Sequence, residues 1–209
     1  MMNQILVGQA RDAVIDGNTL NQLFRFRYKV FHERLGWDVR IENNMEQDAY
    51  DELNPTYIVA KNRRKEIEAC TRLLPTTGPY MLKDTFPQLL CGNEAPADPL
   101  IWELSRFAVL PSNHTEYTQA ILNSLTFDML RSLYEFAHQR GIQQYILVTS
   151  AALERLLKKT GLPLYRFGNR KTQYVGKVLT VVCWLDINEQ FRQAVYKNYT
   201  PAVEERVAA

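Results

Sequence analysis

Polar side chains with complementary chemistry lie in one otherwise apolar stretch, residues 102–109, which reads WELSRFAV. It holds the carboxylate of Glu103, the hydroxyl of Ser105 and the guanidinium of Arg106. Burying an unpaired charge is costly, so Glu103 and Arg106 must pair with each other, with nearby charges or with a substrate. Side chains three apart in a strand share a face only where the strand bulges, and bulges are frequent beside active sites. The stretch therefore predicts a bulged strand that carries either a structural ion pair or a functional site.

More arginines, carboxylates and aromatic residues precede this stretch, in the order Arg27, Phe31, Trp37, Asp48, Asp51, Arg72 and Phe86. Together with Glu103 and Arg106, the charged ones could form one buried or half-buried ion network. Such a network either only holds the N-terminal part of the chain against a sheet or also binds a substrate. We favour the structural role for Arg27 and Asp51, and a catalytic or substrate-binding role for Glu103 and Arg106.

The elements that must position these residues follow from hydrophobic periodicity. An amphipathic helix is predicted over residues 19–35, ending at Gly36, and a longer one over 115–140, with Asn113 as N-cap and Gly141 after its end. Strands are expected at 4–8, 56–60, 66–73, 102–109, 145–148 and 173–185, and shorter helices at 151–160 and 188–196. Two segments, 37–55 and 75–99, are expected to be irregular.

This alternation of strands and helices predicts an α/β fold, a single-domain α-β-α sandwich around a mixed central sheet. The length of 209 residues suits one domain covering residues 1–209. Within it, residues 19 to about 55 are expected to form a helical, lid-like part, and the tail from about 201 to 209 to be frayed.

Composition excludes several classes of protein. The chain is 46% hydrophobic and 23% charged, so general disorder is not expected. Its net charge of +2 provides no global field for nucleic acid, so an acidic partner would need a local basic patch. Three widely spaced cysteines and three histidines make a zinc site or a disulfide framework unexpected. Neither a signal peptide nor a run of about 18 apolar residues is visible, so we expect a cytoplasmic protein without a membrane span.

WELSRFAV, together with residues 77–83 (TGPYMLK), resembles the acyl-homoserine-lactone synthases, the autoinducer synthases of bacterial quorum sensing. The similarity covers roughly residues 22–168, and the ordered set from Arg27 to Arg106 matches the family pattern residue for residue. The resemblance implies an N-acetyltransferase-like fold. In that fold a bulged central strand splays from its neighbour to admit a pantetheine thioester. Here the strands at 102–109 and 145–148 would form the V-shaped gap.

The resemblance also implies the substrates: S-adenosylmethionine and an acyl group on acyl carrier protein, with no further cofactor and no metal. The amine of S-adenosylmethionine attacks the thioester, and its carboxylate then displaces the sulfonium carbon, closing the lactone and releasing 5′-methylthioadenosine. A base must deprotonate the amine; Glu103, directly or through a water, is the first candidate and Asp48 the alternative. Backbone N–H groups freed by a bulge near residues 105–107 would stabilise the oxyanion.

The site residues implied by the resemblance fall into groups. Catalysis is assigned to Glu103, Asp48 and Arg106, and Arg106 would hold the substrate carboxylate. Phe31 and Trp37 would present ring faces to the sulfonium or adenine, or be plain core aromatics. Binding of S-adenosylmethionine is assigned to Arg27, Phe31, Trp37, Asp48, Asp51, Arg72, Phe86, Arg106 and Phe107.

The acyl chain would need an apolar tunnel, although residues of these types are also usual in any core. Candidates for its lining are Met81, Leu104, Phe107, Met129, Leu130, Val148, Thr149 and Leu157. Thr149 would bind an acyl 3-oxo group or simply cap the next helix. A basic helix face, formed by Arg155, Lys158 and Lys159, would dock the acidic carrier protein, or be a solvated helix end.

The identity of the acyl donor depends on a missing motif. The glycine-rich loop that binds pyrophosphate in acetyltransferases is absent after Val109, where residues 110–114 read LPSNH. This favours pantetheine carried on a protein over coenzyme A. Two other classes stay open: an N-acyltransferase that uses acyl-coenzyme A and another amine, and a non-catalytic sensor. A chain without Glu103 or Arg106 would favour the non-catalytic sensor, but this chain has both residues.

Overall fold

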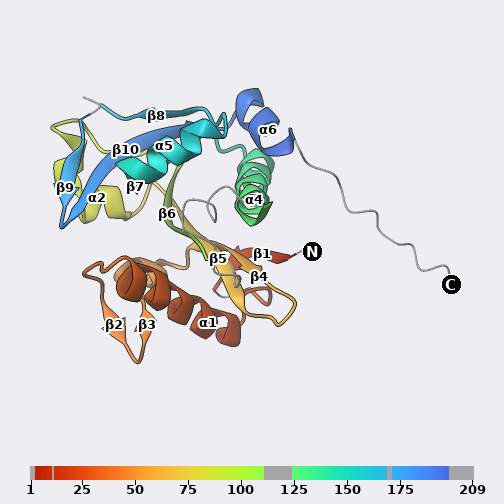
Figure 1. The fold of residues 1–209 in the computed structure, drawn as a ribbon. Helices are drawn as coiled ribbons and strands as arrows, with labels where there is room; N and C mark the ends of the chain where they lie inside the picture. Colours follow the sequence, from red (N-terminus) through yellow and green to blue (C-terminus); the bar gives the residue numbers. More distant parts are fainter. Residues whose placement is uncertain (1–2, 11, 111–123, 169–170, 198–209) are drawn as a thin grey trace.

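A mixed sheet forms the centre of the computed structural model, which describes residues 3–10, 12–110, 124–168 and 171–197 (Figure 1). All neighbouring strands pair antiparallel except β6 and β7, which pair in parallel. In sheet order the strands are β1 (Gln4–Gln9), β4 (Thr56–Lys61), β5 (Ile67–Pro75), β6 (Ile101–Val109), β7 (Gln144–Ser150), β10 (Val178–Asp186) and β8 (Leu164–Arg166), and β9 (Gln173–Val175) pairs with β10. A separate hairpin consists of β2 (Ile41–Glu42) and β3 (Met45–Glu46).

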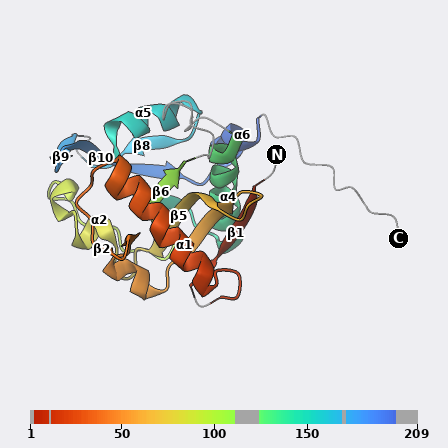
Figure 2. The same ribbon diagram turned by 60° about the horizontal axis from the view of Figure 1, so that its bottom comes forward.

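Helices cover both faces of this sheet. One face packs against α4 (Ser124–Arg140), α5 (Ala151–Lys159) and α6 (Glu189–Tyr196). The other packs against α1 (Gly17–Arg27), its π-helical continuation η1 (Tyr28–Arg34), α2 (Met81–Asp84) and the 3₁₀ turn η3 (Pro87–Leu90). Figure 2 brings α1 to the front, where it crosses the sheet. A second 3₁₀ turn, η2 (Ala49–Leu53), precedes β4. The predicted α-β-α sandwich with a mixed sheet is confirmed.

The predicted elements differ from the observed ones in a few places. The first helix is present, but its second half is a π-helix, and it ends before Gly36, whose φ is +63°. The single strand expected over 173–185 is wrong, because a turn at Gly176 and Lys177 divides it into β9 and β10. The segment 75–99 contains α2 and η3. The N-cap proposed at Asn113 and the tail from 201 lie outside the described residues.

Strand β6 separates from β7 part-way along its length. Their parallel pairing runs from Ile101↔Gln144 to Leu104↔Leu147 and stops there, although β6 continues to Val109 and β7 to Ser150. The predicted gap between these strands is confirmed. Along the described part of the chain, no helix combines the length and hydrophobicity that a membrane crossing requires.

Strand β6 also carries the predicted bulge, on its other edge. Cys70 pairs with Ala108 but Arg72 pairs with Ser105, so one extra residue of β6 lies opposite β5. Arg106 absorbs it with a φ of +53°, a left-handed conformation that non-glycine residues rarely adopt. Two side chains of β5 satisfy carbonyls of the bulge: Thr71 Oγ1 donates to Ser105 O at 3.0 Å, and Cys70 Sγ donates to Arg106 O at 3.4 Å.

Candidate active site

A buried cluster of charges joins α1 to the segment that follows η1. Arg27 ends α1 and is 1% exposed; its Nε donates to Glu46 Oε2 at 2.5 Å and its Nη1 to Asp51 Oδ1 at 2.7 Å. Asp51 also accepts the Tyr57 hydroxyl at 2.8 Å and the backbone N–H of Asp48 at 2.9 Å, which completes a capping box at η2. The segment between η1 and β4 is therefore fixed to α1 from several directions.

Arg72 on β5 and Arg106 on β6 extend this cluster to the sheet. Arg72 Nη1 binds Asp48 Oδ1 at 2.5 Å and Asp51 Oδ1 at 2.9 Å. Arg106 Nη2 binds Glu46 Oε1 at 2.9 Å and Asp48 Oδ2 at 2.8 Å. The side chain of Asp48 is 17% exposed, whereas those of Glu46 and Asp51 are completely buried. We call this set the arginine–carboxylate network; it consists of Arg27, Glu46, Asp48, Asp51, Arg72 and Arg106.

The network keeps its buried carboxylates charged. Burial opposes the charged form of Glu46, but the guanidinium groups of Arg27 and Arg106 outweigh it and hold its pKa below the usual value. In the same way Arg27 and Arg72 overcome burial and hold the pKa of Asp51 well below its usual range. Within the described segments, no three His, Cys, Asp or Glu side chains are grouped so that they could hold a metal ion.

Glu103 lies beside the network but does not join it. Its carboxylate is 1% exposed and accepts backbone N–H groups of Met81 at 3.0 Å and Leu82 at 2.8 Å, at the start of α2. The expectation that Glu103 belongs to the ion network is wrong, because Glu46 occupies that place. Burial raises the pKa of Glu103, against the lowering effect of the two backbone hydrogen bonds. A carboxylate with a raised pKa accepts a proton more readily, as a general base must.

The bulge brings Glu103, Ser105 and Arg106 to one face of the sheet. Ser105 Oγ accepts from Arg72 Nε at 3.2 Å, so both consecutive residues, 105 and 106, point toward the network. Leu104 and Phe107 belong instead to the core on the opposite face, under α4. The strained φ of Arg106 is therefore what places its guanidinium beside Asp48 rather than in that core.

Aromatic side chains border the network. Phe31 and Trp37 stack with ring centroids 5.0 Å apart, and the guanidinium of Arg106 lies 5.4 Å from the Phe31 ring centre. Phe31 is 2% exposed and packs into the core with α1, whereas Trp37 is only partly buried. Tyr50 lies 5.4 Å from the guanidinium of Arg72 on the other side. Trp37 and Tyr50 are thus partly exposed aromatic side chains at the border of the network.

Met81 covers the arginines from the side of α2. Its sulfur accepts from Arg72 Nη2 at 3.0 Å and from Arg106 Nη1 at 3.3 Å. A thioether is a weak acceptor for a guanidinium, although Arg72 Nη2 also donates to Asp48 Oδ2 at 3.1 Å. Arg27 Nη2 is buried and has no hydrogen-bond partner in the described part of the chain. Phe86, also assigned to the substrate site, packs at the end of α2 against the neighbouring core cluster. A ligand oxygen in place of the Met81 sulfur would find two converging N–H donors.

The eight residues assigned to an acyl tunnel lie on both faces of the sheet. Most of them, namely Leu104, Phe107, Met129, Leu130 and Leu157, pack in the core under α4 and α5. Thr149 shares the face of Leu147 on β7, which belongs to the same core. Met81 covers the network and Val148 packs against the core near α2. The lining of a tunnel by this set remains a prediction.

Thr149 does not cap α5. Ser150 does so, because its hydroxyl accepts the backbone N–H of Leu153 at 3.1 Å. Among the described residues, Thr149 Oγ1 is buried and has no hydrogen-bond partner. A buried hydroxyl without a partner is costly and rare, so this atom has an unused donor and acceptor at the end of β7, where β6 has separated.

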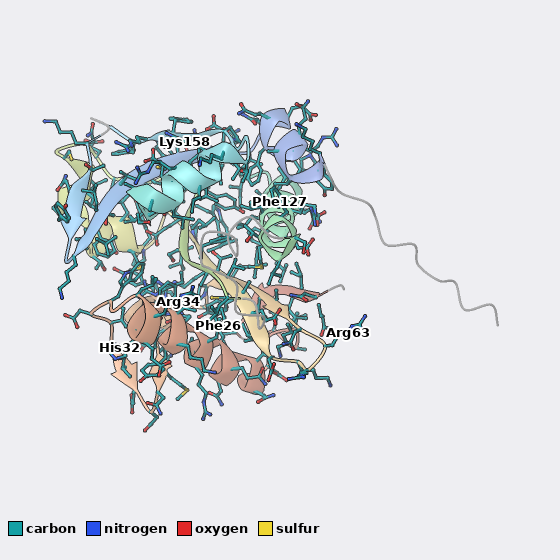
Figure 3. The ribbon with its side chains drawn as sticks, in the orientation of Figure 1. Phe26, His32, Arg34, Arg63, Phe127 and Lys158 are labelled. Carbon is teal, nitrogen blue, oxygen red and sulfur yellow. The ribbon has the colours of Figure 1, made fainter. Side chains whose placement is uncertain are left out.

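The basic residues assigned to carrier docking lie on α5, where Figure 3 labels Lys158. Lys158 Nζ pairs with Glu154 Oε1 at 2.8 Å, and Arg166 of β8 binds the same carboxylate through Nε at 2.9 Å and Nη2 at 2.7 Å. Arg155 and Lys159, four residues apart, share the exposed side of the helix. Arg155 and Lys159 thus form the basic surface, whereas Lys158 pairs within the helix and Arg166 connects the helix to β8 through Glu154.

Sequence reasoning missed three residues of this site: Glu46, Tyr50 and Tyr57. Glu46 stands among six acidic residues of a non-periodic segment, and its neighbours Asp48 and Asp51 attract attention first. The sequence contained a signal for Glu46. Three buried arginines need three carboxylate partners, and Glu46 lies in the same segment as Asp48 and Asp51, whereas Glu103 lies on a distant strand. Tyr57 in a strand reads as an ordinary core residue, and only the structure shows its hydroxyl on Asp51.

Most of the chain matches a family model and curated relatives. A family model described as autoinducer synthase matches residues 12–195. An acyl-homoserine-lactone synthase of Aliivibrio fischeri is 40% identical over 191 residues, which are 91% of this chain and 98% of that protein. The chain belongs to the autoinducer synthase family. It is therefore an acyltransferase of the acyl-homoserine-lactone synthase type, as the motif set predicts.

Solved structures of autoinducer synthases share this fold. The crystal structure of the AHL synthase LasI has a TM-score of 0.82 and 34% sequence identity, covering 96% of this chain and 98% of that one. The CoA-dependent acyl-homoserine lactone synthase BjaI, solved with SAM and isopentyl-CoA, has a TM-score of 0.81 and 26% identity, covering 94% of this chain and 89% of that one. The N-acetyltransferase-like fold expected from the sequence is confirmed.

Proposed function

We propose that this autoinducer synthase transfers an acyl group from acyl carrier protein to the amine of S-adenosylmethionine and then closes the lactone, releasing 5′-methylthioadenosine and a quorum-sensing signal. One observation carries the proposal. The gap between β6 and β7 opens at Leu104, directly before the bulge that turns Arg106 toward the arginine–carboxylate network. An acyl thioester in the gap and a charged amino acid on the network would meet at residues 105–107.

The network supplies complementary charges for S-adenosylmethionine, which carries an ammonium, a sulfonium and a carboxylate. Asp48 is the most exposed carboxylate of the network and is suited to the ammonium. The substrate carboxylate would displace the Met81 sulfur from Arg72 Nη2 and Arg106 Nη1. Trp37 would face the sulfonium or the adenine. In support, the relative BjaI, which has the same fold, was solved with SAM.

Glu103 is proposed as the base that removes a proton from the ammonium. Its burial under α2 raises its pKa, and two backbone donors fix its carboxylate in place. Since it is 1% exposed, the proton would pass through a water between Glu103 and the amine. Backbone N–H groups of the bulge would then stabilise the oxyanion of the tetrahedral intermediate. Thr149 Oγ1, buried without a partner in the described chain, would bind an oxygen at the 3-position of the acyl group.

A carrier protein is proposed as the donor because of two features of the chain. The sequence after Val109 lacks the glycine-rich pyrophosphate loop, and α5 carries the exposed pair Arg155 and Lys159. Coenzyme A is the second candidate, because BjaI is a CoA-dependent relative with the same fold.

The test is to supply the purified protein with S-adenosylmethionine and a panel of acyl groups, each as the carrier-protein and the coenzyme A thioester. Mass spectrometry should find methylthioadenosine and an acyl-homoserine lactone in equal amounts, with the carrier thioesters preferred. Preference for coenzyme A thioesters would refute the proposed donor. Release of free thiol only with other amines would refute the proposed reaction.

A further inference from the structure

Two large apolar side chains are exposed together on the hairpin formed by β9 and β10. Tyr174 is 73% exposed, the most of any large hydrophobic residue in the described chain, and Leu179 is 38% exposed. The two residues pair directly across the hairpin, so their side chains lie side by side on one face. We call them the Tyr174–Leu179 patch.

The patch lies on the same sheet face as α5. Along β10, Leu179 alternates in step with Val181 and Cys183, which belong to the core under α5. The neighbours of Tyr174 in β9 point the other way: Val175 packs near α2, and Gln173 Nε2 donates to Gln88 O at 3.2 Å. One face of the hairpin therefore packs against the region of α2 and η3, and Tyr174 points away from it on the other face.

The patch is also close to the open end of the gap. Thr180, the residue after Leu179, pairs with Ser150, which is both the last residue of β7 and the N-cap of α5. Figure 1 shows the β9–β10 hairpin beside the N-terminal end of α5. A partner that inserts a pantetheine arm between β6 and β7 would therefore contact the start of α5 and this hairpin at the same time.

The surrounding segment is strongly basic. Residues 151–180 contain seven lysines and arginines but one acidic residue, Glu154, although the net charge of the whole chain is only +2. Glu154 is 2% exposed and is bound by Lys158 and Arg166, so it adds no negative charge to the surface. An apolar patch on a segment with an excess of basic residues fits a partner with an apolar spot beside acidic side chains.

We propose that the Tyr174–Leu179 patch is the apolar half of the docking surface for the acyl carrier protein, and that α5 is its electrostatic half. This inference rests on the proposed carrier-protein donor. Tyr174 would pack on the apolar side chains next to the phosphopantetheine-bearing serine of the carrier, while Arg155 and Lys159 would contact its acidic helix. Exposed tyrosines are common anchors of protein interfaces, because one rigid ring buries much apolar area.

The test compares steady-state kinetics of the parent enzyme, Tyr174→Ser and Tyr174→Phe on one acyl group, presented either on the carrier protein or on free pantetheine. Tyr174→Ser should raise KM for the carrier thioester at least about tenfold, as is usual when an interface anchor is truncated. KM for S-adenosylmethionine and turnover of acyl-pantetheine should stay within about twofold, since truncating an exposed side chain leaves the fold intact. Tyr174→Phe should behave like the parent.

Salt separates the two halves of the surface. The loss caused by Arg155→Glu with Lys159→Glu should shrink as salt is added, whereas the loss caused by Tyr174→Ser should persist. Val14→Ser is the matched control, because Val14 is 48% exposed and lies before α1. An unchanged carrier KM in Tyr174→Ser, or equal losses with acyl-pantetheine, would overturn the inference while leaving the proposed reaction intact.

Two further outcomes count against it. If Tyr174→Ser weakens binding to phosphatidylglycerol vesicles but not the carrier KM, the patch binds an anionic membrane instead. If the parent enzyme turns over coenzyme A thioesters and no carrier thioester, the proposed donor fails and this inference fails with it.

Discussion

The molecule contains two sets of ion pairs with different surroundings: the arginine–carboxylate network and the Glu154 cluster, which consists of Glu154 and Lys158 of α5 and Arg166 of β8. In the network, three arginines bind three carboxylates, and Arg27, Arg72 and Arg106 have side chains that are 1%, 0% and 8% exposed. In the cluster, one buried carboxylate is bound by Arg166 and Lys158, which are 29% and 43% exposed. The network thus has equal numbers of positive and negative charges and is buried, whereas the Glu154 cluster has one more positive charge than negative and is open to water.

This difference determines what each region can do. A balanced, buried set has little external field, and its value lies in fixing groups at defined positions. An unbalanced set at the surface keeps a positive field that attracts an acidic partner. The network is therefore suited to holding a small charged substrate in one orientation. The basic surface of α5 is suited to attracting an acidic macromolecule.

The largest effect is expected for Glu103→Gln, at the border of the network. Loss of a general base typically lowers the rate ~10²–10⁴-fold, so kcat should fall by that factor. The melting temperature should fall only modestly: the glutamine Oε1 still accepts one of the two backbone hydrogen bonds, while its NH2 group leaves the other N–H without an acceptor, at a cost of about 1–3 kcal/mol. Near-parent turnover in a folded variant would transfer the base role to Asp48 or to water; a large fall in melting temperature would make Glu103 structural.

Arg27→Met tests the claim that the network is a scaffold. The substitution leaves Glu46 and Asp51 buried with fewer cations, and breaking a buried ion pair costs about 3–5 kcal/mol of unfolding free energy. Arg166→Met is the matched change in the Glu154 cluster, where water and Lys158 remain. It should cost about 1 kcal/mol or less. Urea unfolding measures both, and equal losses would show that the two regions do not differ as described.

Acid should unfold the protein through the network. Because the pKa values of Glu46 and Asp51 are lowered in the folded state, their stabilisation is present above the ordinary carboxyl range and is lost as the pH falls through the folded values. Each extra proton taken up on unfolding makes the free energy of unfolding fall by about 1.4 kcal/mol more per pH unit as the pH is lowered. Glu46→Gln should be less stable at pH 7 but show a shallower decline toward pH 3. A parallel decline in urea titrations would exclude Glu46 as a source of acid sensitivity.

The smallest effect concerns the bulge that supports Arg106. Thr71→Val removes the hydroxyl that satisfies the Ser105 carbonyl, which should cost about 1–3 kcal/mol and lower kcat with little change in KM for S-adenosylmethionine. Thr71→Ser should restore both quantities. Thr56→Val is the control on the neighbouring strand β4, because Thr56 Oγ1 is buried without a hydrogen-bond partner in the described residues. It should be neutral, and a loss equal to that of Thr71→Val would contradict a specific role for the Thr71 hydroxyl.

The sequence predicted much of this arrangement because local chemistry required it. Two charges three apart in a strand share a face only if the strand bulges, which predicted a bulge here, and β6 has one centred on Arg106. What the sequence did not reveal depends on long-range packing. Glu46 becomes a network member only because the β2–β3 hairpin returns it to Arg27, and Glu103 leaves the network only because α2 presents two backbone donors to it. The division of β9 from β10 was missed because the residues on both sides of Gly176 alternate like one strand.

The extra residue in β6 makes the length of this segment as important as its composition. Ala108 and Val109 follow the bulge and pack into different cores, one with α1 and one with α4. Removing one residue from 105–107 would restore regular alternation and exchange the faces of both. Substitutions here alter one contact at a time, whereas a single-codon deletion would invert everything that follows in the strand. In this chain the number of residues in β6 therefore matters to the fold as much as their identity.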